Sequence, residues 1–338
     1  MQRQRIGYID TAKGILILCL LFGHCRILAQ REGLDDPVLQ VMGSGIGLYR
    51  PFFMQTFFLI TGFCSTFRIG FRPFLLKNLQ TLLLPAILLD LLCYGIMAAT
   101  GCTEQSFGIH LAGFSSWLKM GGPWFIFALL GAKLLLWGIS RLKLPRQLLL
   151  VVVLYLLGLA LNHFEWFDNF LWHRHALLAV PFLYGGFLLK DKMDRVQKYL
   201  LPAGLVGMAL IVAENLLSHF TAFTLPANDI FIDVDFFNFP LHLMNVAGGS
   251  ALVFWLAQRL VKNRTLSLLG LGSLLAYLTN ETVQVPLIRL IKPLYPAGSI
   301  AGCLGFHFVA YALCVAVICL LIWLVYKHRA LSWIVGKW

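Results

Sequence analysis

Residues 303–326 read CLGFHFVAYALCVAVICLLIWLVY, a run of consecutive positions without a single charged side chain. A helix needs about 20 mostly apolar residues to cross the roughly 30 Å hydrocarbon core of a bilayer. This stretch is therefore predicted to cross a membrane as one helix.

The rest of the chain has the same character. Of its 338 residues, 59% are hydrophobic and 12% are charged, and the mean hydropathy is +0.80. A soluble domain carries about 25% charged residues, so this chain has too few polar groups to cover a globular surface. Its 27 Phe, 9 Trp and 10 Tyr also exclude a disordered chain. The composition predicts an all-α, polytopic integral membrane protein.

Hydrophobic stretches of sufficient length recur along the whole chain, and no linker or soluble domain separates them. We expect about ten transmembrane helices that form a single transmembrane domain over residues 1–338. The predicted spans are 11–29, 48–67, 79–100, 123–140, 147–162, 176–190, 199–218, 240–258, 266–290 and 303–326.

The basic residues support an even number of spans. They gather in six clusters that all fall on one side of a ten-span arrangement, whereas the opposite loops are rich in acidic residues. Under the positive-inside rule both termini are then cytoplasmic, and the net charge of +12 needs no nucleic-acid partner. We expect a multi-pass protein of a bacterial inner or plasma membrane. The clusters are Arg3 and Arg5; Arg68, Arg72 and Lys77; Arg141, Lys143 and Arg146; Lys190, Lys192, Arg195 and Lys198; Arg259, Lys262 and Arg264; Lys327, Arg329 and Lys337.

Neither metal binding nor covalent catalysis has a sequence signature here. The eight cysteines lie mostly inside apolar stretches and show no metal-site spacing. No nucleophile elbow and no P-loop is present. We therefore expect no metal and no bound cofactor.

The first predicted span carries three ionisable residues: Asp10, Lys13 and His24. At about 100° per residue, Lys13 and His24 share one helix face and lie about 16 Å apart along the axis. Asp10 precedes Lys13 by three residues and is its neighbour on the helix surface. Charged groups inside a bilayer are costly and mark functional sites. The pattern suits a general base that serves a hydroxyl, a proton relay, or an interfacial ion pair with a structural histidine.

The same residues resemble the opening of the membrane acyltransferase-3 family, especially its fucose 4-O-acetylase-like branch. That family has an acidic residue, a basic residue, and a histidine eleven positions after the basic one, which here are Asp10, Lys13 and His24. Much of the family has Arg at the position of Lys13. The resemblance continues in order along the chain at residues 51–63 (PFFMQTFFLITGF), 122–125 (GPWF), Arg174 with 181–186 (PFLYGG), and 269–273 (LGLGS) through Tyr277.

The chain departs from the family in one place. Many relatives carry a histidine just after the late tyrosine element, where this sequence has Asn280 and Glu281. Either that position is dispensable, or Glu281 serves in its place.

The resemblance implies transfer of an acetyl or other short acyl group from acetyl-CoA, or a related acyl-CoA, which is a co-substrate. The acceptor would be a hydroxyl of a carbohydrate or other cell-envelope molecule. Membrane lipid would surround the protein, and the resemblance is compatible with a homo-oligomer. His24 would be the general base, with Asp10 as the second catalytic residue. Lys13 and Arg72 would bind the donor. The acceptor would contact Trp124, Arg174, Asn280 and Glu281.

Several of these residues have simpler interpretations. Trp124 follows a proline at a span's end, where tryptophan often anchors a helix at the membrane interface. Arg174 at a span boundary could extend its guanidinium toward water. The positive-inside rule alone explains why Arg72 lies in a basic cluster.

Two other kinds of protein remain compatible with the sequence. A proton-coupled secondary transporter would use Asp10, Lys13, His24, Asp90, Lys133 and Glu281 as a path, although no matching halves are found. A membrane sensor or scaffold would keep the fold without catalysis.

Overall fold

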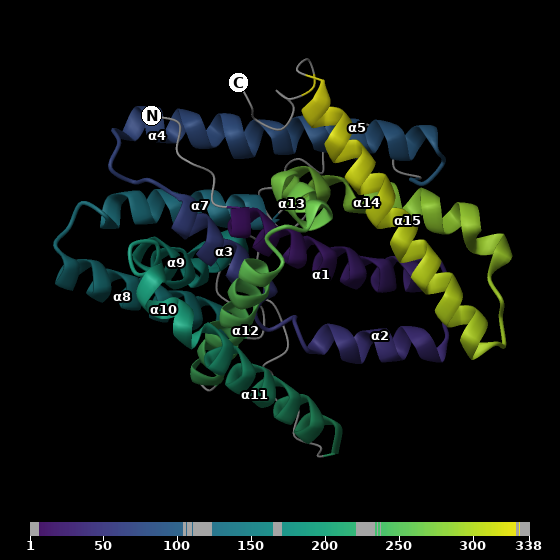
Figure 1. Ribbon diagram of the computed structural model, residues 1–338. Helices are drawn as coiled ribbons and strands as arrows, with labels where there is room; N and C mark the ends of the chain where they lie inside the picture. The colour runs from purple at the N-terminus through teal and green to yellow at the C-terminus, as the bar shows by residue number, and fades with distance from the viewer. Residues whose placement is uncertain are drawn as a thin grey trace. The chain divides into compact units, whose positions relative to one another are not determined.

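The computed structural model describes residues 7–103, 124–164, 171–220 and 238–328, together with the single residues 106, 110, 234, 236 and 331. Within them every regular element is a helix (Figure 1). The predicted all-α class is therefore confirmed. Two of the connections between predicted spans, 101–122 and 219–239, lie largely outside the described residues.

The helices fall into two compact units. The first unit holds the N- and C-terminal helices: α1 (Gly7–Arg31), α2 (Pro37–Gly47), most of α5 (Leu84–Ala99), α13 (Arg264–Leu271), α14 (Ser273–Ile291), a 3₁₀ turn (Lys292–Leu294) and α15 (Ile300–Lys327). The second holds α3 (Phe53–Cys64), α4 (Phe71–Asn78), a π-helical turn (Leu79–Leu83), α7 (Trp124–Ile139), α8 (Leu144–His163), α9 (Leu171–Leu189), α10 (Met193–Val196), a 3₁₀ turn (Gln197–Tyr199), α11 (Leu200–Phe220) and most of α12 (Phe239–Arg259).

Within the described ranges, six helical stretches are long and apolar enough to cross a membrane. They are Gly7–Arg31, Phe71–Ala99, Leu144–His163, Met193–Leu217, Phe239–Arg259 and Ile300–Lys327. Three shorter apolar helices accompany them: Phe53–Cys64, Trp124–Ile139 and Arg174–Leu189. The chain is thus a polytopic helical membrane protein, while the count of ten spans and the cytoplasmic termini stay predictions.

Each predicted span overlaps helical structure, although the bounds differ: the span 79–100, for example, is the later part of a helical stretch that begins at Phe71. The span 266–290 contains two helices, α13 and α14, which meet at Gly272. Hydropathy does not reveal this break because the apolar run continues across it. The span 48–67 is helical only over α3, which begins after Pro51 and ends at the extended Ser65.

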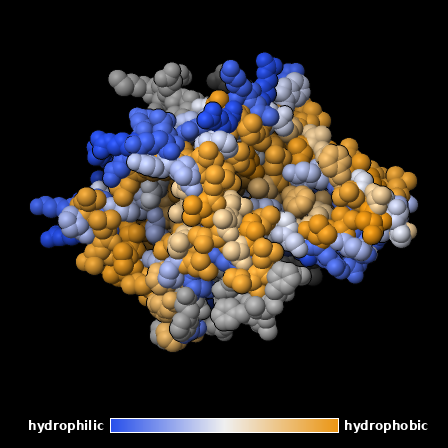
Figure 2. Space-filling model, turned by 60° about the horizontal axis from the view of Figure 1, so that its bottom comes forward, coloured by the Kyte–Doolittle hydropathy of each residue, from blue (hydrophilic) through white to orange (hydrophobic). Residues whose placement is uncertain are grey.

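The outer surfaces of several helices are apolar. Figure 2 shows hydrophobic side chains over much of one face. Helix α8 exposes Leu149 and Val152, and α15 exposes Leu304 and Phe308. Large exposed apolar side chains in this number are costly in water and suit a surface that faces lipid.

In the second unit, α9 is the central helix and packs against α3, α7 and α8. Helices α3 and α9 approach closely because glycines face backbone: a Cβ at Gly62 would overlap the carbonyl of Leu183, and one at Gly186 would overlap that of Leu59. Small residues allow such close helix contacts in membranes. Two stretches that resemble family elements, 51–63 and 181–186, therefore meet in this contact.

In the first unit, α1 is the central helix and packs against α13, α14, α15 and α2. A core cluster joins its second half to α2 and α14 and includes Leu28, Leu39 and Ile288. Helix α1 thus carries Asp10, Lys13 and His24 through the middle of this unit.

Candidate functional site

Helix α13 is seated on the first turns of α1. A Cβ at Gly270 would overlap the backbone carbonyl of Asp10, and the hydroxyls of Thr11 and Ser267 lie 3.4 Å apart. Only glycine permits so close a backbone approach at residue 270. The late family-like stretch 269–273 therefore fixes where the chain turns into α14.

Helix α14 then runs beside the second half of α1. Its Gln284 donates from Nε2 to the backbone oxygen of Leu21, at 3.4 Å. One turn earlier on α14, the carboxylate of Glu281 faces His24, with 3.8 Å between Nδ1 of the imidazole and Oε1. The structure thus brings His24 together with Glu281, one of the two residues that the sequence sets against the late family histidine.

The other oxygen of this carboxylate faces an arginine. Nη1 of Arg31 lies 3.5 Å from Oε2 of Glu281. Arg31 follows His24 by seven residues, which is close to two full turns, so both side chains project from one face of α1. Glu281 accordingly lies between two groups of α1.

This group is accessible. The side chains of His24 and Glu281 are 33% and 49% exposed, respectively. Asp10 and Lys13 are half-buried on the same helix. A partly exposed imidazole beside a carboxylate can exchange protons with a bound molecule.

Asn280, predicted to contact an acceptor, is oriented differently. Its side chain is buried, and its Nδ2 donates to the backbone oxygen of Tyr277 at 2.6 Å. Neighbouring helix positions point about 100° apart, so Asn280 does not share the face of Glu281.

Three of the predicted site residues, Trp124, Arg174 and Arg72, belong to the second unit, and only the first two lie near each other. Trp124 of α7 contacts His175 of α9 with 4.9 Å between ring centroids, and the adjacent Arg174 is buried. Nη1 of Arg174 lies 3.4 Å from the backbone oxygen of Leu161 on α8. Trp124 and Arg174 are thus brought to one region of this unit. Arg72, in contrast, is exposed in the first turn of α4.

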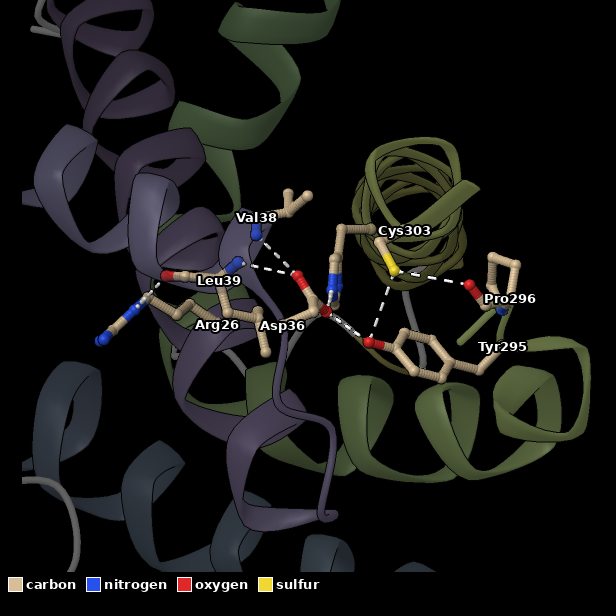
Figure 3. A network of polar contacts seen from close by, with 8 residues as sticks. Arg26, Asp36, Val38, Leu39, Tyr295, Pro296 and Cys303 are labelled. Carbon is tan, nitrogen blue, oxygen red and sulfur yellow. Dashed lines mark hydrogen bonds and ion pairs between the residues drawn. The ribbon is translucent and has the colours of Figure 1, made fainter. Parts of the chain in front are cut away.

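The first unit contains a second histidine–carboxylate pair. Oδ2 of Asp36 accepts hydrogen bonds from the Tyr295 hydroxyl at 2.6 Å and from Nε2 of His307 at 2.8 Å (Figure 3). Oδ1 accepts from the backbone N–H groups of Val38 and Leu39 and so caps the N-terminus of α2. Cys303 completes the network with an Sγ contact of 3.5 Å to the Tyr295 hydroxyl.

These bonds keep Asp36 ionised. Burial alone would raise the pKa of its carboxyl, but the hydrogen bonds from His307, Tyr295 and the Leu39 N–H outweigh it and lower the pKa below the ordinary value. The carboxylate therefore persists at neutral pH. Every oxygen of Asp36 is committed to protein groups, which is the signature of a structural site.

Three residues of these two groups, Arg31, Asp36 and His307, were not predicted from the sequence. The seven-residue spacing of Arg31 from His24 is a readable signal, as is the pair Asp36–Pro37, since an Asp N-cap followed by a proline at the first helical position marks a helix start. The pairing of Asp36 with His307 had no local signal because 271 positions separate the two residues.

Neither the comparison with curated proteins nor that with solved structures yields a match. The family model described as an acyltransferase domain matches residues 6–328, nearly the whole chain. The chain therefore belongs to the acyltransferase-3 family of membrane acyltransferases.

Proposed function

We propose that this membrane acyltransferase moves an acetyl or other short acyl group from an acyl-CoA to a hydroxyl of a carbohydrate or other cell-envelope acceptor. His24 is the general base of the transfer. The observation that carries the proposal is the partly exposed imidazole of His24 on α1, the central helix of the first unit. The chain belongs to a family of acyltransferases, and a base of this kind suits that reaction.

The proposed step needs no group beyond the two substrates and the base. The acceptor hydroxyl gives its proton to the neutral imidazole of His24, and its oxygen attacks the thioester carbonyl carbon. A new C–O bond forms, the C–S bond breaks, and coenzyme A leaves as the thiolate, which takes up a proton. An ester and free coenzyme A result.

The residues proposed to bind the acyl donor are chosen by their charge. Coenzyme A is polyanionic, and the basic clusters of the predicted cytoplasmic face would raise its local concentration. Lys13, about three turns before His24 on α1, is proposed to contact the donor, with Asp10 beside it. Exposed Arg72 is a second candidate donor contact.

The acceptor side is argued from side-chain chemistry. An aromatic ring such as that of Trp124 can stack on a sugar, and the guanidinium of Arg174 can bind hydroxyls. These roles, and the placement of the protein in a bacterial inner membrane, are proposals.

The test follows label from radioactive acetyl-CoA into the envelope fraction of membranes that contain equal amounts of wild-type, His24→Ala or His328→Ala protein. His328 is an exposed histidine at the end of α15 and serves as the matched control. We expect label with wild type and His328→Ala and its loss with His24→Ala.

Other outcomes identify which part fails. Label unaffected by His24→Ala removes this residue as the base. Folded wild-type protein that incorporates no label contradicts an acetyl-CoA donor. Solute movement by the same protein in proteoliposomes without acyl-CoA would then favour the transporter.

A further inference from the structure

We propose that Glu281 is a positioning residue for His24: its carboxylate holds the imidazole through Nδ1 and leaves Nε2 to accept the proton. This inference rests on the proposed function and deepens it. It also gives Glu281 a role toward the base in place of the acceptor contact expected from the sequence.

The first argument is the orientation of the ring. Of the two ring nitrogens, Nδ1 is the one that faces the carboxylate, 3.8 Å from Oε1. The exposed glutamate side chain has three rotatable bonds, so a small rotation converts this contact into a hydrogen bond. Catalytic hydrogen bonds are commonly longer in the absence of substrate than in its complex.

The second argument concerns the tautomer. A neutral imidazole has one N–H donor and one acceptor nitrogen, whereas an ionised carboxylate only accepts. A hydrogen bond to Glu281 therefore requires the proton on Nδ1, and the lone pair is then on Nε2. When Nε2 takes the proton of the acceptor hydroxyl, the imidazolium is next to a negative charge, which stabilises it.

The third argument is that the carboxylate of Glu281 also lies near a second ionisable group of α1. Arg31 contacts Oε2 while His24 contacts Oε1, and both groups project from one face of α1. The two oxygens of Glu281 are thus directed to two different groups. The positive charge of Arg31 near the second oxygen favours the arrangement in which Oε1 faces the imidazole.

The fourth argument is that the pair contributes little to the stability of the fold. The side chains of His24 and Glu281 are 33% and 49% exposed, and ion pairs this open to the surface add little to stability. A substitution at residue 281 should therefore leave the protein folded, so that a change in rate reports on the chemistry.

The test compares Glu281→Gln, His24→Ala and the double variant with wild type in steady-state acetyl transfer from acetyl-CoA to the acceptor that the labelled fraction identifies. Glu32→Gln is the matched control because it makes the same change in an ion pair of this unit, with Arg289, that does not involve His24. Thermal unfolding in detergent checks that each variant is folded.

We expect Glu281→Gln to lower kcat by about 10- to 100-fold, less than the loss of the base itself, with the KM for acetyl-CoA unchanged within about twofold. In the His24→Ala background the same substitution should change the residual rate by less than about twofold, because its effect passes through the imidazole. Glu32→Gln should resemble wild type.

Failure of this inference can be told from failure of the proposed function. A wild-type protein without acetyl transfer contradicts the function. If wild type is active and His24→Ala is not, but Glu281→Gln behaves like Glu32→Gln, the function stands and the positioning role is overturned. An equal loss from Glu281→Gln with and without His24 also overturns it.

Discussion

The described residues of the first unit include two histidine–carboxylate pairs that have opposite surroundings. His307 and Asp36 are 2.8 Å apart, and their side chains are 3% and 5% exposed. His24 and Glu281 are 3.8 Å apart, and their side chains are 33% and 49% exposed. In addition, Asp36 receives the Tyr295 hydroxyl and two backbone N–H groups, so its hydrogen-bonding capacity is used by the protein.

The difference shows how the same two residue types can serve structure or chemistry. A buried pair with all its partners in place loses much if one partner is removed, and it offers no lone pair to a substrate. A longer, exposed pair contributes little stability but can accept a proton from a bound molecule. Substitutions in the exposed pair should therefore change the rate of transfer, whereas substitutions in the buried pair should change the stability of the fold.

The largest effect is expected at His24. Removal of a general base lowers the rate by about 10²- to 10⁴-fold, so His24→Ala should reduce kcat by such a factor. Since the side chain is partly exposed, the free energy of unfolding should change by less than about 1 kcal/mol. Initial rates and denaturation in detergent measure the two quantities. A large loss of stability with normal turnover per folded molecule would instead make His24 a structural residue like His307.

The next effect is expected at Asp36, and it concerns stability. Asp36→Ala leaves His307 buried without its carboxylate and removes the cap of α2, which should cost about 3–5 kcal/mol. Thermal unfolding in detergent measures this change. The neighbouring Asp35 is exposed, so Asp35→Ala should leave the unfolding temperature unchanged. Equal effects of the two substitutions would contradict a structural role for the buried pair.

A smaller loss of stability is expected at Tyr295, whose hydroxyl donates to Oδ2 of Asp36 at 2.6 Å. Tyr295→Phe removes one hydrogen bond to a charged group, which contributes about 1.5–3 kcal/mol. His307 and the backbone N–H groups still hold the carboxylate, so the loss should stay below that of Asp36→Ala. Unfolding of the single and double variants measures the coupling. Additive losses would show that the hydroxyl does not act through Asp36.

Much of this fold follows from composition, because 59% apolar residues cannot be covered in water and helices satisfy their own backbone in lipid. The spans 11–29 and 303–326 coincide with long helices for that reason. The break at Gly272 was not predicted, since it depends on how α13 packs against α1 rather than on hydropathy.

Only those parts of the site that lie on one helix were predictable from the sequence. The spacing of Asp10, Lys13 and His24 depends on one helix and is visible in the sequence. The contact between His24 and Glu281 depends on the turn between α13 and α14, so Glu281 could be named as a candidate but not placed beside the base. The role of Asp36 could not be predicted because its partners, His307 and Tyr295, are remote in sequence.

The smallest effect is expected at Arg31, and it tests how the exposed pair is held. Arg31 is itself exposed and contacts Oε2 of Glu281 at 3.5 Å, so the contact is worth about 0–1 kcal/mol. Arg31→Ala should therefore lower kcat by no more than about fivefold, with no measurable change in unfolding.

The matched control for Arg31 is Arg289→Ala, since Arg289 is an exposed arginine that pairs with Glu32 and not with Glu281. Initial rates of the two variants, each with and without Glu281→Gln, make the comparison. If Arg31 only restrains the carboxylate, its removal has no further effect once residue 281 is a glutamine, whereas an effect that persists would place Arg31 in contact with a substrate. Either result says which charges around His24 serve the imidazole, because a residue that acts through Glu281 must become silent when that carboxylate is gone.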